Sequence, residues 1–199
     1  EIDPALGDCS SIYIKRRSVA LQQQKTIQDS LRRLEQSALT ATSSSVDEAE
    51  IRVQEASLIQ DFVRRASTIE PNGIVVVSRG GVVSDIMLED GDEIVIPKVT
   101  DVVMVSGEVM MPKAVTWDET MSLDDYLGAV GGVSNRADDK NILVAKANGE
   151  VGLADDLGVE AGDQILVMPR FDSKNMQLAK DLMQILYQMA VATHVVVDL

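Results

Sequence analysis

Leu-Glu-Asp-Gly-Asp-Glu-Ile-Val-Ile-Pro, residues 88–97, returns in altered form as Val-Glu-Ala-Gly-Asp-Gln-Ile-Leu-Val-Met-Pro at residues 159–169. Gly91 and Gly162 occupy the same place in the two copies, and the second copy has one extra residue before its proline. Each copy joins a Gly-Asp turn to a short aliphatic run that ends at proline, a pattern typical of a turn followed by a β-strand. The repeat predicts a chain built from copies of one small module.

Two further segments extend the repeat toward the N-terminus. Residues 12–15 and 142–146 are similar short β-branched runs, but the first run lies much farther from its glycine, Gly91, than the second lies from Gly162. The extra length in the first copy is close to the length of segment 17–71, which has a helical pattern. We therefore predict that helices are inserted between two strands of the first copy, where the second copy has only residues 148–150.

The inserted segment predicts two long helices. The first runs from Arg16 to about Ala41, and the second from Val46 to about Ile69, with Ser45 and Glu48 in the spacing of a capping box. A serine-rich turn between them favours an antiparallel hairpin, which acts either as a partner-binding arm or as a structural spacer. The predicted apolar faces consist of Ile27, Leu31, Leu34 and Ala38 on the first helix and Ala49, Val53, Ala56, Val63 and Ala66 on the second.

The remainder of the chain reads mainly as short strands. One short helix is predicted from Leu123 to Val130, with Ser122 as its N-cap and Gly131-Gly132 at its end. The segments that are β-branched and bounded by Gly, Pro, Asp or Asn predict strands at 11–15, 74–77, 81–88, 93–96, 101–107, 114–116, 142–146, 151–153 and 164–168.

Charge and composition exclude several classes of function. Eighteen Lys and Arg against 32 Asp and Glu give a net charge of −14, which disfavours nucleic acid and anionic lipid surfaces as partners. The single cysteine, Cys9, cannot form an intrachain disulfide, and the single histidine, His194, has no zinc-type cluster near it in sequence. We predict no catalytic residue, metal or cofactor, so the protein is not expected to be an enzyme; acidic pairs such as Asp124-Asp125 are interpreted as solvated surface.

A set of motifs between residues 103 and 169 carries a resemblance to a known family. They are Val-Ser-Gly-Glu-Val at 105–109, Pro112, Leu-Asp-Asp-Tyr-Leu at 123–127, Gly131-Gly132, Asp138, Ile-Leu-Val at 142–144, Asn148-Gly149 and Gly162-Asp163. Together they resemble the soluble-ligand-binding β-grasp (SLBB) module of bacterial polysaccharide export proteins. The first copy matches only in part, between about Asp8 and Pro97, and its front half is absent.

The resemblance implies an α+β fold of β-grasp modules and a C-terminal fragment of a longer protein of the capsule-export subgroup. Residues 1–98 are expected to form a partial first module interrupted by a helical hairpin at 17–71. Residues 99–170 are expected to form a second module, and residues 171–199 a C-terminal amphipathic helix and a short strand.

In this family the implied function is mechanical. Subunits form a homo-oligomeric ring in the periplasm, associated with the outer membrane, and conduct polysaccharide outward. The implied partners are the polysaccharide and an inner-membrane co-polymerase or transporter. Two alternatives remain: a monomeric β-grasp module that binds a soluble ligand or glycan, and a structural adaptor whose hairpin holds another protein.

The motif residues are expected to act mainly in structure. Asp92 and Asp163 follow glycine in tight turns, where a carboxylate can accept backbone N–H groups. Tyr126 and Trp117 suit either stacking on sugar rings or core packing. The full expected set is Gly91, Asp92, Gly107, Glu108, Pro112, Tyr126, Gly131, Gly132, Gly162 and Asp163.

The C-terminal segment 175–193 predicts a helix that is apolar around most of its circumference. Its apolar part, residues 182–192, is about 16 Å long at 1.5 Å per residue, short of a membrane core of ~30 Å. We expect the helix to pack against a β-grasp module or between subunits, with membrane insertion as the alternative by analogy with the family; a strand is predicted at 194–198. The candidate contact residues are Leu178, Leu182, Ile185, Leu186 and Met189.

Overall fold

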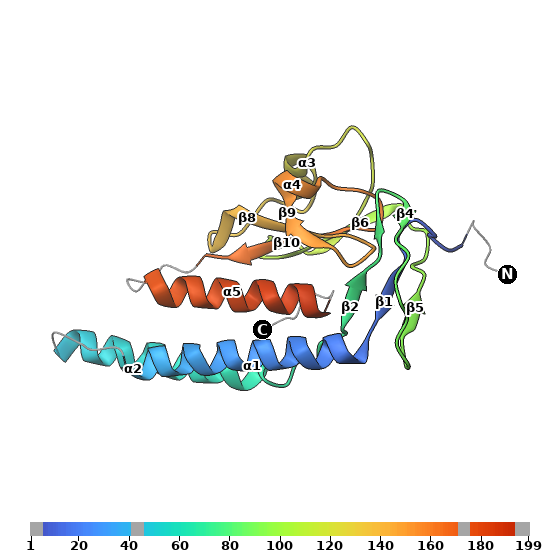
Figure 1. The fold of residues 1–199 in the computed structure, drawn as a ribbon. Helices are drawn as coiled ribbons and strands as arrows, with labels where there is room; N and C mark the ends of the chain where they lie inside the picture. The colour runs from blue at the N-terminus through green and yellow to red at the C-terminus, as the bar shows by residue number, and fades with distance from the viewer. Residues whose placement is uncertain (1–5, 41–45, 171–175, 194–199) are drawn as a thin grey trace.

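A computed structural model describes residues 6–40, 46–170 and 176–193 as a stack of layers. A five-stranded sheet carries α3 on one face and α5 on the other, and the α1–α2 hairpin lies beyond α5 (Figure 1). A small three-stranded sheet lies at one end of the stack. The predicted α+β class is confirmed, because helices and sheets both contribute to the fold.

The five-stranded sheet has the order β7-β6-β10-β8-β9. The central strands β6 and β10 are parallel, whereas every other neighbouring pair is antiparallel. Since side chains alternate across a strand, Val103 and Val105 of β6 are fully buried while Met104 between them is 45% exposed. The strands are β6 (Val102–Gly107), β7 (Lys113–Thr116), β8 (Ala137–Ala145), β9 (Val151–Leu153) and β10 (Gln164–Pro169).

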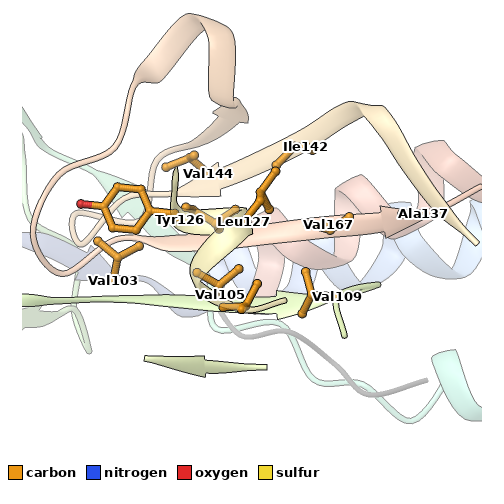
Figure 2. Packing of buried hydrophobic residues seen from close by; sticks show 11 residues of the cluster. Val103, Val105, Val109, Tyr126, Leu127, Ala137, Ile142, Val144 and Val167 are labelled. Carbon is orange, nitrogen blue, oxygen red and sulfur yellow. The ribbon is translucent and has the colours of Figure 1, made fainter. Parts of the chain in front are cut away.

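Helix α3 (Leu123–Ala129) closes one face of this sheet. As predicted, Ser122 is its N-cap, because the Asp125 N–H donates to Ser122 Oγ at 3.3 Å and the Ser122 N–H donates to Asp125 Oδ2 at 2.8 Å. Tyr126 and Leu127 project from the helix onto the sheet valines (Figure 2). The resulting core contains Val103, Val105, Val109, Tyr126, Leu127, Val130, Ala137, Ile142, Val144, Ile165 and Val167. A second short helix, α4 (Ala154–Leu157), was not predicted.

The three-stranded sheet has the order β2-β1-β5, with β1 (Tyr13–Lys15) antiparallel to both β2 (Ile74–Val76) and β5 (Glu93–Val95). A two-stranded hairpin, β3 (Ser78–Arg79) and β4 (Val82–Val83), follows β2. The predicted strand at 81–88 is therefore wrong beyond Val83. Residues 84–88 instead form the return from this hairpin, and the Met87 carbonyl accepts a hydrogen bond from Arg16 Nη2 at 3.0 Å.

Helices α1 (Arg17–Thr40) and α2 (Val46–Ala66) occupy the connection between β1 and β2. The equivalent connection between β8 and β9 is a turn at residues 146–150. The predicted seam on α1 is buried at Ile27, Leu31 and Leu34, but Val53 on α2 is 70% exposed, so its assignment to the seam is wrong. Ile59 contributes to the buried cluster instead. Ser45 lies outside the described residues.

Helix α5 (Met176–Thr193) packs on the hairpin through one side and faces the five-stranded sheet with another. Leu182, Ile185 and Met189 are buried in a cluster with the hairpin residues. The Tyr187 hydroxyl donates to the Val151 carbonyl at 3.1 Å, which ties the helix to β9. Asn72, just after the hairpin, secures the end of the helix through the Ala192 and Thr193 carbonyls.

Within residues 6–40, 46–170 and 176–193, no helix combines the length and the apolar character that crossing a membrane requires. The strand predicted at 194–198 lies outside the described residues. Leu186 is half-buried, and the side chain of Leu178 is not described.

The joint packing of α1, α2 and α5 can be tested at Leu34, which is fully buried. Leu34→Ala should lower the free energy of unfolding by about 3 kcal/mol, because it removes methyl groups from a packed cluster and leaves a cavity. Leu21→Ala is the matched control, since Leu21 lies on the same helix but is 57% exposed; its effect should stay within about 0.5 kcal/mol. Equal effects of the two variants in urea unfolding would contradict this packing.

Candidate functional site

A basic side chain is paired with two carboxylates at the Gly-Asp turn of the second repeat; this group, Lys146, Glu160 and Asp163, is called a clasp below. Lys146 Nζ contacts Asp163 Oδ2 and Glu160 Oε2, each at 2.9 Å. The backbone N–H of Glu160 also donates to Asp163 Oδ2 at 2.7 Å. The side chains of Lys146 and Asp163 are 11% and 2% exposed, so two opposite charges neutralise each other inside the fold.

The first repeat holds an equivalent clasp. Arg16 donates to both carboxylate oxygens of Asp92, with Nη2 to Oδ2 at 2.7 Å and Nε to Oδ1 at 3.0 Å. Arg16 Nη1 also contacts Glu89 Oε1 at 3.1 Å, and the Glu89 N–H donates to Asp92 Oδ2 at 2.9 Å. The side chains of Arg16 and Asp92 are 14% and 4% exposed.

The two clasps correspond residue by residue. In the first repeat, Arg16 and Asp92 are 76 positions apart in sequence. In the second repeat, Lys146 and Asp163 are 17 positions apart. The difference between these two separations equals the extra length between the repeated strand and its glycine in the first copy. The glycines before the two aspartates both have positive φ, 85° for Gly91 and 88° for Gly162. The structure therefore brings each repeated Gly-Asp turn onto the basic residue that follows the repeated strand.

The sequence prediction found the aspartates but missed Arg16 and Lys146. Asp92 and Asp163 do accept backbone N–H groups, as expected for such turns. The signal for their partners was present, because Arg16 and Lys146 stand at the same distance after the isoleucine that begins each aligned run, Ile12 or Ile142.

The electrostatics of the clasps follow from burial and hydrogen bonding. The hydrogen bonds from the Arg16 guanidinium, with the Glu89 N–H, lower the pKa of Asp92 below its usual range. Burial raises the pKa of Asp163, against the opposing hydrogen bonds from Lys146 and the Glu160 N–H. Burial also acts to lower the pKa of Lys146, but its hydrogen bonds to Asp163 and Glu160 outweigh this and raise it.

Several predicted motif residues meet at one corner of the five-stranded sheet. Gly107 has φ 84°, and a Cβ there would lie 2.2 Å from the Val167 carbonyl oxygen, so only glycine allows this close approach. The Ser134 N–H donates to the Glu108 carbonyl at 2.8 Å, and Ser134 Oγ donates to Glu108 Oε2 at 2.5 Å. The corner thus fastens the end of β6 to the loop after α3.

The predicted glycine pair forms the other half of this corner. Gly131 and Gly132 have φ 85° and 86°, and their N–H groups donate to the carbonyls of Gly128 and Leu127 at 3.0 and 2.8 Å. This is a Schellman termination of α3. The Gly132 carbonyl then accepts a hydrogen bond from the Met110 N–H at 3.0 Å. Pro112 is exposed beyond this corner, before β7.

The aromatic residues considered for sugar stacking serve the core instead. Tyr126 is fully buried, and its hydroxyl accepts from the Asp118 N–H at 3.0 Å. Trp117 is partly buried against the same core, and its Nε1 donates to the Val159 carbonyl at 3.3 Å. Of the two interpretations, core packing is the one the structure supports.

The described part of the chain contains no group of three or more His, Cys, Asp or Glu side chains placed to hold a metal ion. Cys9 is an exposed free thiol, and His194 lies outside the described residues. Asp124 is exposed and Asp125 serves in the helix cap. The buried charged side chains of the two clasps are paired with one another. This arrangement suits the fixing of backbone segments rather than the transfer of protons.

Comparison with known proteins assigns a domain family to the C-terminal half of the chain. A family model for the SLBB domain matches residues 101–194. Two polysialic acid transport proteins KpsD from Escherichia coli are each 38% identical to this chain over 196 residues, which is 98% of this chain and 35% of each relative. Residues 101–194 of the chain therefore form an SLBB domain, and the chain as a whole is similar to the shared third of these transport proteins. It spans about a third of the length of these curated relatives.

The SLBB match covers the five-stranded sheet, α3, α4 and α5. It includes the second clasp and the corner of the sheet where Gly107, Gly131 and Gly132 lie. It confirms the resemblance drawn from the sequence motifs and the β-grasp-like fold that they implied. The first repeat lies outside the matched range, although the KpsD relatives align with nearly all of the chain.

Shallow grooves lie along α5 among the described residues. One, of about 480 Å³, lies between α5 and the five-stranded sheet, and a second, of about 350 Å³, lies between α5 and α1. Tyr187, which is 41% exposed, lines both. The second groove is also lined by Gln23 and Gln188, whose Oε1 atoms are buried and accept no hydrogen bond within the described residues.

The lowered pKa of Asp92 predicts a specific acid response. Because the folded pKa lies below the unfolded one, this carboxylate stabilises the fold fully above its unfolded pKa and loses that contribution as the pH falls through the folded value. Between about pH 5 and about pH 2, the wild-type chain should therefore lose more unfolding free energy than Asp92→Asn. Denaturant unfolding across this range measures the difference, with the exposed Asp124→Asn as control. Parallel acid curves for wild type and Asp92→Asn would contradict the role of the clasp.

Proposed function

We propose that this chain forms part of a capsular or exopolysaccharide export protein, which acts as a conduit and not as an enzyme. The observation that carries the proposal is the 38% identity to polysialic acid transport proteins across 98% of the chain. The shared length includes both repeats, the inserted hairpin and the SLBB domain, so the likeness concerns a whole architecture and not one isolated module.

The proposed setting is the periplasm, in association with the outer membrane. There the protein forms a homo-oligomeric ring that works with an inner-membrane co-polymerase or transporter. Head-to-tail contacts between unlike faces of a subunit generate rings when the rotation closes. Strand β7 is an edge strand of the five-stranded sheet among the described residues, so its edge is available for such contacts.

The physical character of the chain suits a passive role. Its buried charges are paired within the clasps, and its charge of −14 gives little attraction for an anionic polymer. Weak contact with the cargo favours passage, because a conduit that bound its polymer tightly would retain it. Tyr126 is fully buried and Trp117 is partly buried against the same core, so packing engages both of these aromatic rings.

A second candidate, binding of a soluble ligand or glycan by a monomer, is favoured by one observation. The groove between α1 and α5 combines an exposed tyrosine with two buried amide oxygens that accept no hydrogen bond within the described residues. Such a surface suits a small molecule that carries hydroxyl donors. Binding of a monosaccharide at this groove, with no effect of gene deletion on export, would favour this candidate.

The export proposal predicts the outcome of an in-frame gene deletion in the native bacterium. Polysaccharide should disappear from the cell surface and accumulate inside the cell, because synthesis continues while the outward path is lost. Both pools are quantified by polysaccharide-specific antibody or lectin on intact and lysed cells.

Restoration by a plasmid copy of the wild-type gene is the control for this experiment. Normal surface polysaccharide in a deletion strain without a related second gene would contradict the export role. Loss of both the surface and internal pools would contradict it as well, since that result indicates a role in synthesis.

A further inference from the structure

The two repeats share the same three-stranded unit. In the first, β1 pairs with β2 and β5; in the second, β8 pairs with β9 and β10. Lys15 stands opposite Ile74 and Glu93, just as Ala145 stands opposite Val151 and Gln164. The sheet order β2-β1-β5 therefore matches β9-β8-β10, and β5 corresponds to β10.

In the second repeat, β10 is an interior strand. It pairs with β8 on one side and with β6 on the other. Strand β6 runs parallel to β10, with Val105 opposite Ile165. The Met104 N–H donates to the Asp163 carbonyl at 3.0 Å, and the Glu108 N–H donates to the Val167 carbonyl at 2.9 Å. Helix α3 then covers the face, so that Ile165 is fully buried.

In the first repeat, β5 is an edge strand among the described residues. Ile94, which corresponds to the fully buried Ile165, is 58% exposed. Met87 and Leu88 before the turn and Val99 after the strand are also more than half exposed. An aliphatic edge strand with unpaired backbone groups is prone to pairing with another strand, and a group of exposed apolar side chains beside it often marks an interaction surface.

We infer that the β5 edge is the docking site for a strand and helix equivalent to β6 and α3, supplied by a part of the same polypeptide outside residues 1–199. The second repeat gives the geometry. The incoming strand runs parallel to β5, donates to the Asp92 carbonyl, and places its residue equivalent to Val105 opposite Ile94. The following helix covers Ile94 as α3 covers Ile165.

The occupant is assigned to the same polypeptide for two reasons. The curated relatives extend well beyond the region they share with this chain, since the match covers 35% of each of them. In addition, the second repeat completes its own sheet from its own chain, through a β6 that precedes β8 in sequence. The inference does not depend on what the protein transports.

The geometry also specifies one residue of the incoming segment. Gly107 ends β6 against the Val167 carbonyl, where a Cβ would come within 2.2 Å of the oxygen. The equivalent carbonyl in the first repeat belongs to Ile96, just after β5. The strand that docks on β5 therefore carries a glycine opposite Ile96.

Thiol reactivity tests the inference. Ile94→Cys is made in a Cys9→Ser background, because Cys9 is itself an exposed thiol, and its reaction rate with a maleimide is measured in the isolated 199-residue chain and in the full natural gene product. The thiol should react freely in the isolated chain and about 100-fold more slowly in the gene product, as expected for a group exposed only by local opening. Ile165→Cys gives the rate for a buried position, and Leu21→Cys gives the rate for an exposed one.

Two results would overturn the inference. Equal reactivity of Ile94→Cys in both proteins would show that no other part of the polypeptide covers β5. Protection that disappears on dilution of either protein would assign the edge to a second copy of the chain, for example through the open edge of β7. Protection in the gene product that is independent of concentration supports docking within one polypeptide.

Discussion

A basic side chain held against the aspartate of a Gly-Asp turn fixes the geometry of each repeat. Removing Arg16 or Lys146 from water is unfavourable unless each meets its carboxylate, and each carboxylate in turn orders the turn backbone by accepting an N–H group. The clasp joins the residue that follows β1 or β8 to the residue that precedes β5 or β10. Strand pairing and register follow, because these two points define where each antiparallel pair begins.

This constraint explains how a long hairpin is accommodated without disturbing the sheet. The insertion begins directly after Arg16, whose side chain and backbone are both held, and ends at Gly73, whose carbonyl accepts a hydrogen bond from the Arg16 N–H at 2.9 Å. Lys146 and the Glu150 carbonyl make the same backbone bond in the uninterrupted repeat, at 2.8 Å. The hairpin thus leaves and rejoins the sheet at one hydrogen-bonded pair, and α5 covers its apolar seam against the SLBB sheet.

The sequence predicted the features that depend on local chemistry. The Gly-Asp turns, the Ser122 cap, the Gly131-Gly132 termination and the two long helices all follow from residues near one another in the chain. Features that depend on distant partners were missed or misjudged. Arg16 and Asp92 meet although they are 76 positions apart, and Val53 was assigned to a seam that α5 and Ile59 complete. Residues 86–88 are aliphatic, but they lie on the path back to the first clasp and not in a strand.

A pair of double-mutant cycles tests the shared clasp most directly. Lys146→Met, Asp163→Leu and their double variant are compared by urea unfolding, and Arg16→Met, Asp92→Leu and their double variant form the second cycle. The predicted result is a favourable coupling of at least about 1 kcal/mol between Lys146 and Asp163, and a coupling of the same sign between Arg16 and Asp92. Additive effects in both cycles would contradict the claim that one interaction organises both repeats.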